Sequence, residues 1–111
     1  KGQSTVQPIV QQILDDELVK GFDSEETYKK FKENCENSKT RLLTILKNAK
    51  SEGKSIAGYG ATSKSTTILN YCGIGPELID FISDTTPIKQ NKVTPGMHIP
   101  VESYEFFKEN N

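Results

Sequence analysis

The sequence predicts a mixed α/β fold, in which helices flank a small parallel sheet of about three strands after an N-terminal helical lead-in. Three observations support this prediction. Apolar residues recur with helical spacing over the first fifty residues. A short apolar run then meets a turn with two glycines, and a new helical pattern follows it. Two further short apolar runs, near residues 80 and 100, supply the remaining strands.

The helical lead-in covers residues 1–53 and consists of two helices, of which the second is long. The first helix is expected within residues 1–20, with Pro8 in its first turn and Gly21 as its stop signal. The second runs to about residue 51, where its apolar positions follow steps of three and four. That apolar seam favours packing on a partner domain, and self-association as a coiled coil is the alternative. Its positions are Tyr28, Phe31, Cys35, Leu42, Ile45 and Ala49.

Residues 54–111 are predicted to form a Rossmann-like domain. The first strand covers 55–60, and the helix after it is capped by Thr62 or Ser63 and ends at Gly73. The second strand covers 78–84, and residues 85–98 form a loop. A short third strand at 98–101 and a last helix after Ser103 follow. Three strands are few for such a sheet, so we expect the chain to be truncated at its C-terminus, and its first residue, Lys1, suggests a piece of a longer protein.

Composition and charge narrow the possible functions. The net charge is -1, from 14 basic and 15 acidic residues, so no general attraction to nucleic acid is implied. No apolar run approaches the roughly 20 residues of a membrane span, and no secretory signal is present, so we expect a cytoplasmic protein without a membrane partner. Cys35 and Cys72 match no metal-site spacing and are expected to be free thiols.

The turn after the first strand is the strongest candidate site. Gly58-x-Gly60-x-x-Ser63 is close to the dinucleotide fingerprint, in which the first glycine permits a tight turn and the second lets a phosphate approach the backbone. Lys64 could add a charge to that phosphate, and Asp84 stands where a ribose-binding acid belongs. A plain strand–helix turn remains the alternative. Acidic residues are absent between Gly53 and Pro76 and again between Thr85 and Val101, which favours an anion site.

Four blocks of the sequence are informative when taken together and in order. They are Gly58-Tyr59-Gly60-Ala61-Thr62-Ser63-Lys64, Leu69-Asn70-Tyr71-Cys72-Gly73-Ile74, Asp84-x-x-Pro87-x-Lys89-Gln90 and Pro95-Gly96-x-His98-Ile99-Pro100-Val101. These blocks resemble the C-terminal domain of S-adenosylmethionine-dependent C-methyltransferases that act on nucleotide-diphosphate deoxysugars, and the resemblance covers about residues 40–107. Ser63 and Ser65 stand where this family often has Ala and Gly, and Asn91 stands where it often has Gly, which leaves substrate preference open.

The resemblance implies that this domain binds the nucleotide-diphosphate sugar and packs on a catalytic domain. It also implies that the methyl donor and the catalytic residues belong to a central domain, and zinc to an N-terminal domain, neither of which is in this chain. No catalytic or metal-binding residue is therefore predicted here, and the fragment alone is expected to be inactive. The candidate substrate-binding residues are Gly58, Tyr59, Gly60, Ala61, Thr62, Ser63, Lys64, Asp84, Lys89 and His98.

Some of these candidates have plainer interpretations. His98 is more often a structural hydrogen-bonding residue in such a context, Tyr59 either stacks on a base or packs, and Lys89 and Lys92 are often only solvated. Two other function classes also stay open. One is a non-enzymatic Rossmann-like module that binds NAD, coenzyme A or a free nucleotide. The other is an interaction domain whose working surface is the long helix. The sequence makes no prediction of oligomeric state.

Overall fold

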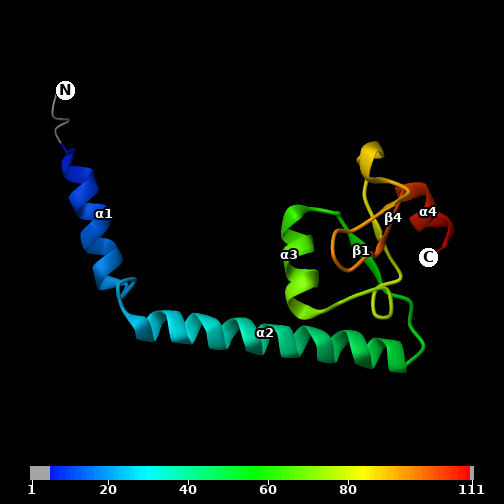
Figure 1. Cartoon of the computed structure of the whole chain (residues 1–111), viewed down its shortest axis with the longest axis horizontal. Coiled ribbons are helices and arrows are strands. Elements are labelled where there is room, and N and C mark those ends of the chain that lie inside the picture. Colours follow the sequence, from blue (N-terminus) through cyan, green and yellow to red (C-terminus); the bar gives the residue numbers. More distant parts are fainter. Residues whose placement is uncertain (1–5, 111) are drawn as a thin grey trace. The chain divides into compact units, whose positions relative to one another are not determined.

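The computed structural model describes residues 6–110, which form four α-helices, a short 3-10 helix and four strands (Figure 1). Residues 1–5 of the predicted first helix and the terminal Asn111 lie outside the described residues. The elements are α1 Pro8–Val19, α2 Glu25–Ser51, β1 Ala57–Tyr59, α3 Ser63–Cys72, β2 Phe81–Ser83, the 3-10 helix Pro87–Lys89, β3 Lys92–Val93, β4 Pro100–Glu102 and α4 Tyr104–Glu109.

The chain divides into two compact units, Lys1–Asn37 and Ser38–Asn111, and α2 contributes to both. In the first unit, Pro8 stands in the first turn of α1, as predicted, and Gly21 adopts a positive φ of 69° just after that helix. None of the α1 side chains is buried. The large apolar side chains of this unit are 42–88 % exposed; they are Val6, Ile9, Val10, Ile13, Leu14, Leu18, Val19, Phe22, Tyr28 and Phe31.

The second unit is built on a four-stranded sheet in the order β1-β2-β4-β3. Strands β1, β2 and β4 run parallel, with Gly58 opposite Ile82 and Ile82 opposite Val101. These are the three predicted strands, so the α/β class and the mainly parallel sheet are confirmed. The helix α3 connects β1 to β2, as Figure 1 shows. On β2, Phe81 meets Phe106 of α4 edge to face, with ring centroids 5.1 Å apart.

The fourth strand lies where the sequence predicted a loop. Within 85–98, the chain forms the 3-10 helix and then β3, which pairs antiparallel with β4. This pairing depends on a tight turn in which the Thr94 N–H donates to the Ile99 carbonyl at 2.9 Å and the His98 N–H donates to the Thr94 carbonyl at 3.0 Å. A two-residue strand is too short to show an alternating apolar pattern, so the prediction of loop was wrong there.

The second predicted strand is also shorter than expected. Leu78 and Ile79 do not pair with β1, because their backbone N–H groups both donate to the Gly75 carbonyl at 3.0 Å and form a turn. Both side chains are nevertheless buried, which is why they look like strand residues in the sequence. The pairing therefore begins only at Phe81.

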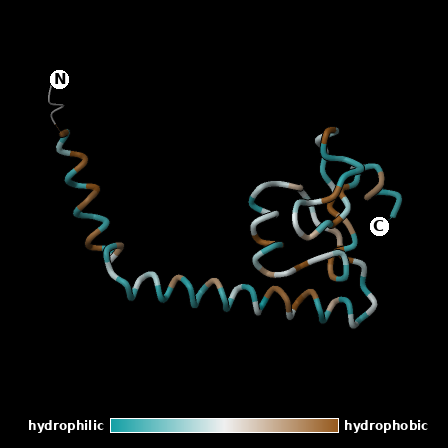
Figure 2. The backbone as a smooth tube through the Cα atoms, in the orientation of Figure 1, coloured by the Kyte–Doolittle hydropathy of each residue, from teal (hydrophilic) through white to brown (hydrophobic). Residues whose placement is uncertain are grey.

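The core of the second unit lies between the sheet and its helices. The second half of α2 contributes Leu46 to the core and packs Leu42 and Leu43 against it, and in Figure 2 hydrophobic colour appears in this half of the helix, alternating with hydrophilic colour. The thiol of Cys72 is buried here, while Cys35 is partly exposed, and both are free, as predicted. The other buried core residues are Leu69, Ile74, Leu78, Ile79, Ile82, Ile99 and Val101.

The ends of α3 follow the predicted signals. Thr62 is the N-cap, and its hydroxyl accepts from the Ser65 N–H at 3.1 Å, while the Ser65 hydroxyl accepts from the Thr62 N–H at 2.9 Å. This reciprocal pair satisfies two of the backbone donors that a helix start leaves free. Gly73 ends the helix with a φ of 68°. Within residues 6–110, no helix is both long enough and apolar enough to cross a membrane.

Candidate functional site

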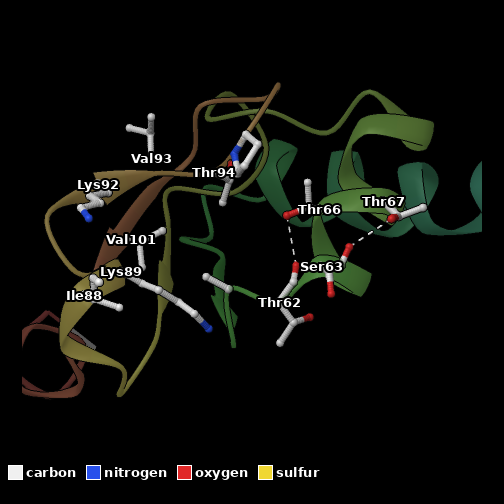
Figure 3. Close-up of a pocket in the computed structure, with 12 residues that line it drawn as sticks. Thr62, Ser63, Thr66, Thr67, Ile88, Lys89, Lys92, Val93, Thr94 and Val101 are labelled. Atoms are coloured by element: carbon white, nitrogen blue, oxygen red, sulfur yellow. Dashed lines mark hydrogen bonds between the residues drawn. The ribbon is translucent and has the colours of Figure 1, made fainter.

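A pocket of about 630 Å³ lies beside the start of α3 (Figure 3). Its wall is formed on one side by the turn after β1 and the first half of α3, and on the other by the 3-10 helix, β3 and β4. The twelve lining residues are Ala61, Thr62, Ser63, Thr66, Thr67, Ile88, Lys89, Lys92, Val93, Thr94, Pro95 and Val101.

The pocket joins the two segments that lack acidic residues. Every lining residue belongs either to 53–76 or to 85–101, so the wall contains two lysines, five hydroxyl side chains and no carboxylate. Two lysines in a wall without a carboxylate favour an anionic ligand. The sequence predicted that these two segments line an anion site, and the fold brings both of them to one pocket.

Glycine is needed at two positions of the turn, Gly58 and Gly60, for different physical reasons. A Cβ on Gly58 would approach Cγ1 of Ile82 to 3.0 Å, so this glycine lets β1 pack closely on β2. Gly60 has a φ of 87°, and a Cβ there would meet only Cγ2 of Thr62, at 3.8 Å. The Gly60 N–H donates to the Ser83 carbonyl at 2.8 Å. Gly60 is therefore required for its backbone conformation, and Gly58 for packing.

The start of α3 presents hydroxyl groups and backbone donors. The hydroxyls of Thr66 and Thr67 donate to the carbonyls of Thr62 and Ser63, each at 3.0 Å (Figure 3). The backbone N–H groups of Ser63 and Lys64 find no acceptor within the described residues. Since unpaired N–H groups concentrate positive potential at the start of a helix, this side of the pocket is suited to an anion.

Asp84 lies next to the turn, but its carboxylate is already hydrogen-bonded to other groups of the chain. Its carboxylate accepts from the backbone N–H of Ala61 and of Thr86, each at 2.8 Å, and from the Lys89 ammonium at 3.0 Å. Only 6 % of the residue is exposed. These donors, led by the Thr86 N–H, hold the pKa of Asp84 well below its ordinary value of 3.8, because they stabilise the charged form. Asp84 is thus an ionised carboxylate within the chain's own network.

The predicted site residues separate into two groups. Ala61, Thr62, Ser63 and Lys89 line the pocket. The other six lie outside its wall: Tyr59 is 79 % exposed at the end of β1, Lys64 is exposed on α3, and His98 is exposed in the turn before β4 with a φ of 56°. Gly58, Gly60 and Asp84 do not line the pocket but act on the turn that does. Gly58 lets β1 pack on Ile82, Gly60 adopts a positive φ, and Asp84 accepts from the Ala61 N–H.

Several lining residues were not among the predicted site residues. The hydroxyls of Thr66 and Thr67 come from the second turn of α3, and Lys92, Val93 and Thr94 come from β3 and its turn. A signal for them exists in the sequence, because the two acid-free segments contain them all. The remaining unpredicted lining residues are Ile88, Pro95 and Val101.

Two cofactors follow from the resemblance, and neither fits this site. Among residues 6–110, no group of three or more His, Cys, Asp or Glu side chains is arranged to hold a metal ion, so these residues do not suit zinc. The pocket has two lysines and no carboxylate in its wall. That wall does not suit the cationic sulfonium of S-adenosylmethionine, because like charges repel.

Comparisons with known proteins identify the family. The whole chain, residues 1–111, matches the family model described as the C-methyltransferase C-terminal domain. The chain is also 38% identical over 100 residues to the C-methyltransferase NovU of Streptomyces niveus, an alignment that covers 90% of this chain and 24% of NovU. The chain thus spans about a quarter of that relative's length. We conclude that the chain belongs to the C-methyltransferase C-terminal domain family.

Proposed function

We propose that the chain is the substrate-binding domain of an S-adenosylmethionine-dependent C-methyltransferase and that its pocket binds a nucleotide-diphosphate sugar. The observation that carries this proposal is the acid-free wall, which combines Lys89 and Lys92 with the unpaired backbone N–H of Ser63 at the start of α3. A diphosphate group carries the charge and the acceptor oxygens that such a wall would satisfy. The apolar part of the wall, Ile88, Val93 and Val101, would contact the base or the sugar.

The chain's own residues bind and orient the substrate in this proposal. The N–H group of Ser63 and the Lys89 ammonium would hold the phosphate oxygens. S-adenosylmethionine would supply the methyl group from another part of the polypeptide, and no step of that transfer is assigned to residues of this chain. The chain alone is then expected to bind the substrate without methylating it. Nucleotide sugars and free thiols are both compatible with a cytoplasmic enzyme.

The first unit supports a second part of the proposal, in which the domain packs on the rest of the methyltransferase. Among residues 6–37, ten large apolar side chains are exposed, and α1 buries none of its residues. Exposed apolar surface of this extent is typical of an interaction face. The relative NovU extends well beyond the aligned region, so a methyltransferase of that length has further chain available to cover such a face.

A titration of the chain with thymidine diphosphate glucose, followed by amide chemical shifts, tests the substrate proposal. We expect the largest shifts at residues 61–67 and 88–95, which surround the pocket. His98→Ala is the matched control, since His98 is exposed outside the wall and its loss should leave the affinity unchanged. A parallel titration with NAD and coenzyme A separates the alternatives. Tighter binding of either, or unchanged shifts at residues 61–67 with the sugar nucleotide, contradicts the proposal.

A further inference from the structure

The carboxylate of Asp84 connects the two walls of the pocket. Its Oδ2 accepts both from the Ala61 N–H at 2.8 Å and from the Lys89 ammonium at 3.0 Å, while Oδ1 accepts from the Thr86 N–H. Ala61 belongs to the turn after β1, and Lys89 ends the 3-10 helix on the opposite side. A single buried oxygen therefore fixes the separation of one residue from each wall.

Lys89 keeps donors available for a ligand. Its side chain is 39 % exposed and lines the pocket, while the carboxylate that holds it is buried. An ammonium has three N–H donors, and Asp84 accepts one of them. The loop itself is also held, because the Gln90 side-chain amide donates to the Asp84 carbonyl at 2.9 Å. The remaining Lys89 donors are thus presented at the pocket from a restrained position.

We propose that Asp84 is a positioning residue of the sugar-nucleotide site, which holds the Lys89 ammonium at the pocket so that it donates to the diphosphate of the bound ligand. This inference rests on the proposed function and deepens it. It assigns Asp84 an indirect role, in place of the direct contact with a ribose or sugar hydroxyl that the sequence suggested. The ligand group concerned is the diphosphate, and Lys89 is the residue that contacts it.

Lys92 provides the matched comparison. It lines the same pocket and is exposed, but its side chain makes no ion pair or hydrogen bond among residues 6–110, whereas the Lys89 side chain pairs with Asp84. A lysine restrained in the free protein loses less conformational freedom on binding than a freely moving one. We therefore expect Lys89 to contribute more than Lys92 to the affinity for a diphosphate, although both carry the same charge.

The test is a double-mutant cycle on the affinity of the chain for thymidine diphosphate. Lys89→Ala is expected to weaken binding by about tenfold to a hundredfold, the effect of a hydrogen bond between charged groups, and Lys92→Ala by a few-fold at most. Asp84→Asn is expected to cost about as much as Lys89→Ala, and the double variant no more than either alone. Affinity for thymidine, which has no phosphate, should be unchanged in all variants.

Two outcomes would overturn the inference. Losses that multiply in the double variant mean that Asp84 acts independently of Lys89, and a loss of thymidine affinity in Asp84→Asn means that Asp84 contacts the nucleoside. Wild-type chain that binds no thymidine diphosphate would instead contradict the proposed function, so the two failures are distinguishable.

If Asp84→Asn does not fold, the contact between Lys89 and the diphosphate is tested by NMR on the wild-type chain. The ¹⁵Nζ resonance of Lys89, assigned with Lys89→Arg, is expected to shift when thymidine diphosphate is added and to stay in place when thymidine is added. An unchanged Lys89 resonance at saturating thymidine diphosphate overturns the inference.

Discussion

The side-chain amide of Asn70 occupies the space that a Cβ on Gly96 would need. Asn70 lies on α3, and its Nδ2 donates to the Thr66 carbonyl at 2.8 Å and to the Pro95 carbonyl at 3.0 Å. Gly96 has a φ of 82°, so the turn both needs a left-handed residue and leaves no room for a side chain. This contact ties the end of the pocket wall at Pro95 to the helix on its other side.

Gly96→Ala is therefore expected to destabilise the chain strongly. The left-handed backbone alone costs an alanine about 1–2 kcal/mol, and the displaced Asn70 amide adds the loss of about one hydrogen bond, roughly 1 kcal/mol. Gly53→Ala is the matched control, since Gly53 has a φ of 76° but a Cβ there would meet nothing within 4 Å. Urea unfolding measures the free energy of unfolding of both variants. Equal losses in the two variants would contradict the role given to Asn70.

The turn after β1 gives a second packing prediction. Gly58→Ala places a methyl group 3.0 Å from Cγ1 of Ile82, whose side chain is buried, so we expect about 1–3 kcal/mol of destabilisation from overpacking. The double variant Gly58→Ala with Ile82→Ala should lose less stability than the sum of the two single variants, because the cavity receives the methyl group. Thermal unfolding of the four proteins measures this coupling. Additive losses would mean that Gly58 is needed for its backbone conformation and not for packing.

The sequence predicted those parts of the fold that depend on local signals. Pro8 and Gly73 mark helix ends through their own backbone chemistry and were identified correctly, and the N-cap Thr62 was one of the two residues predicted for that position. Strand β3 was missed because its two residues pair with β4 only through the Thr94–Ile99 turn, a tertiary arrangement with no periodic pattern. Asn91, which stands where the family often has Gly, does adopt a left-handed φ of 58°.

The candidate site was only partly predictable for the same reason. The turn residues Ala61, Thr62 and Ser63 were identified because a glycine pattern marks them, and they do line the pocket. Lys92 and Thr94 line it from a segment about 30 residues away in the sequence, which no local motif connects to the turn. Asp84 has the position expected of a ligand-binding acid, but its partners depend on how the following loop folds back.

Acid should destabilise the chain through two aspartates that flank β2. The pKa of Asp84 is lowered from 3.8, mainly by the Thr86 N–H, and that of Asp80 is lowered mainly by the hydrogen bond from Lys50, whose Nζ lies 2.7 Å from its carboxylate. Since both pKa values are depressed in the folded state, their stabilisation is complete above the unfolded pKa and is lost as the pH falls below about 3.8 toward the folded values.

Urea unfolding of the wild type and of Asp84→Asn, at about pH 6 and about pH 3, measures that contribution. We expect the stability of the wild type to fall more steeply than that of Asp84→Asn over this interval, because the variant has no carboxylate to protonate. Asp80→Asn should reduce the slope as well, since its carboxylate also accepts from the Ile56 N–H at 2.8 Å. Parallel pH profiles for all three proteins would contradict the depressed pKa values.

The apolar face of the first unit yields a prediction that separates folding from docking. Ile13→Asp changes a side chain that is 51% exposed, so the unfolding free energy of the chain should change by less than about 0.5 kcal/mol. Ile74→Ala, in the core of the second unit, should cost about 2–5 kcal/mol instead. In a longer polypeptide that contains the rest of the methyltransferase, Ile13→Asp should increase proteolysis around α1, because the proposed contact is weakened. Unchanged proteolysis there would mean that this face is not covered by the rest of the enzyme.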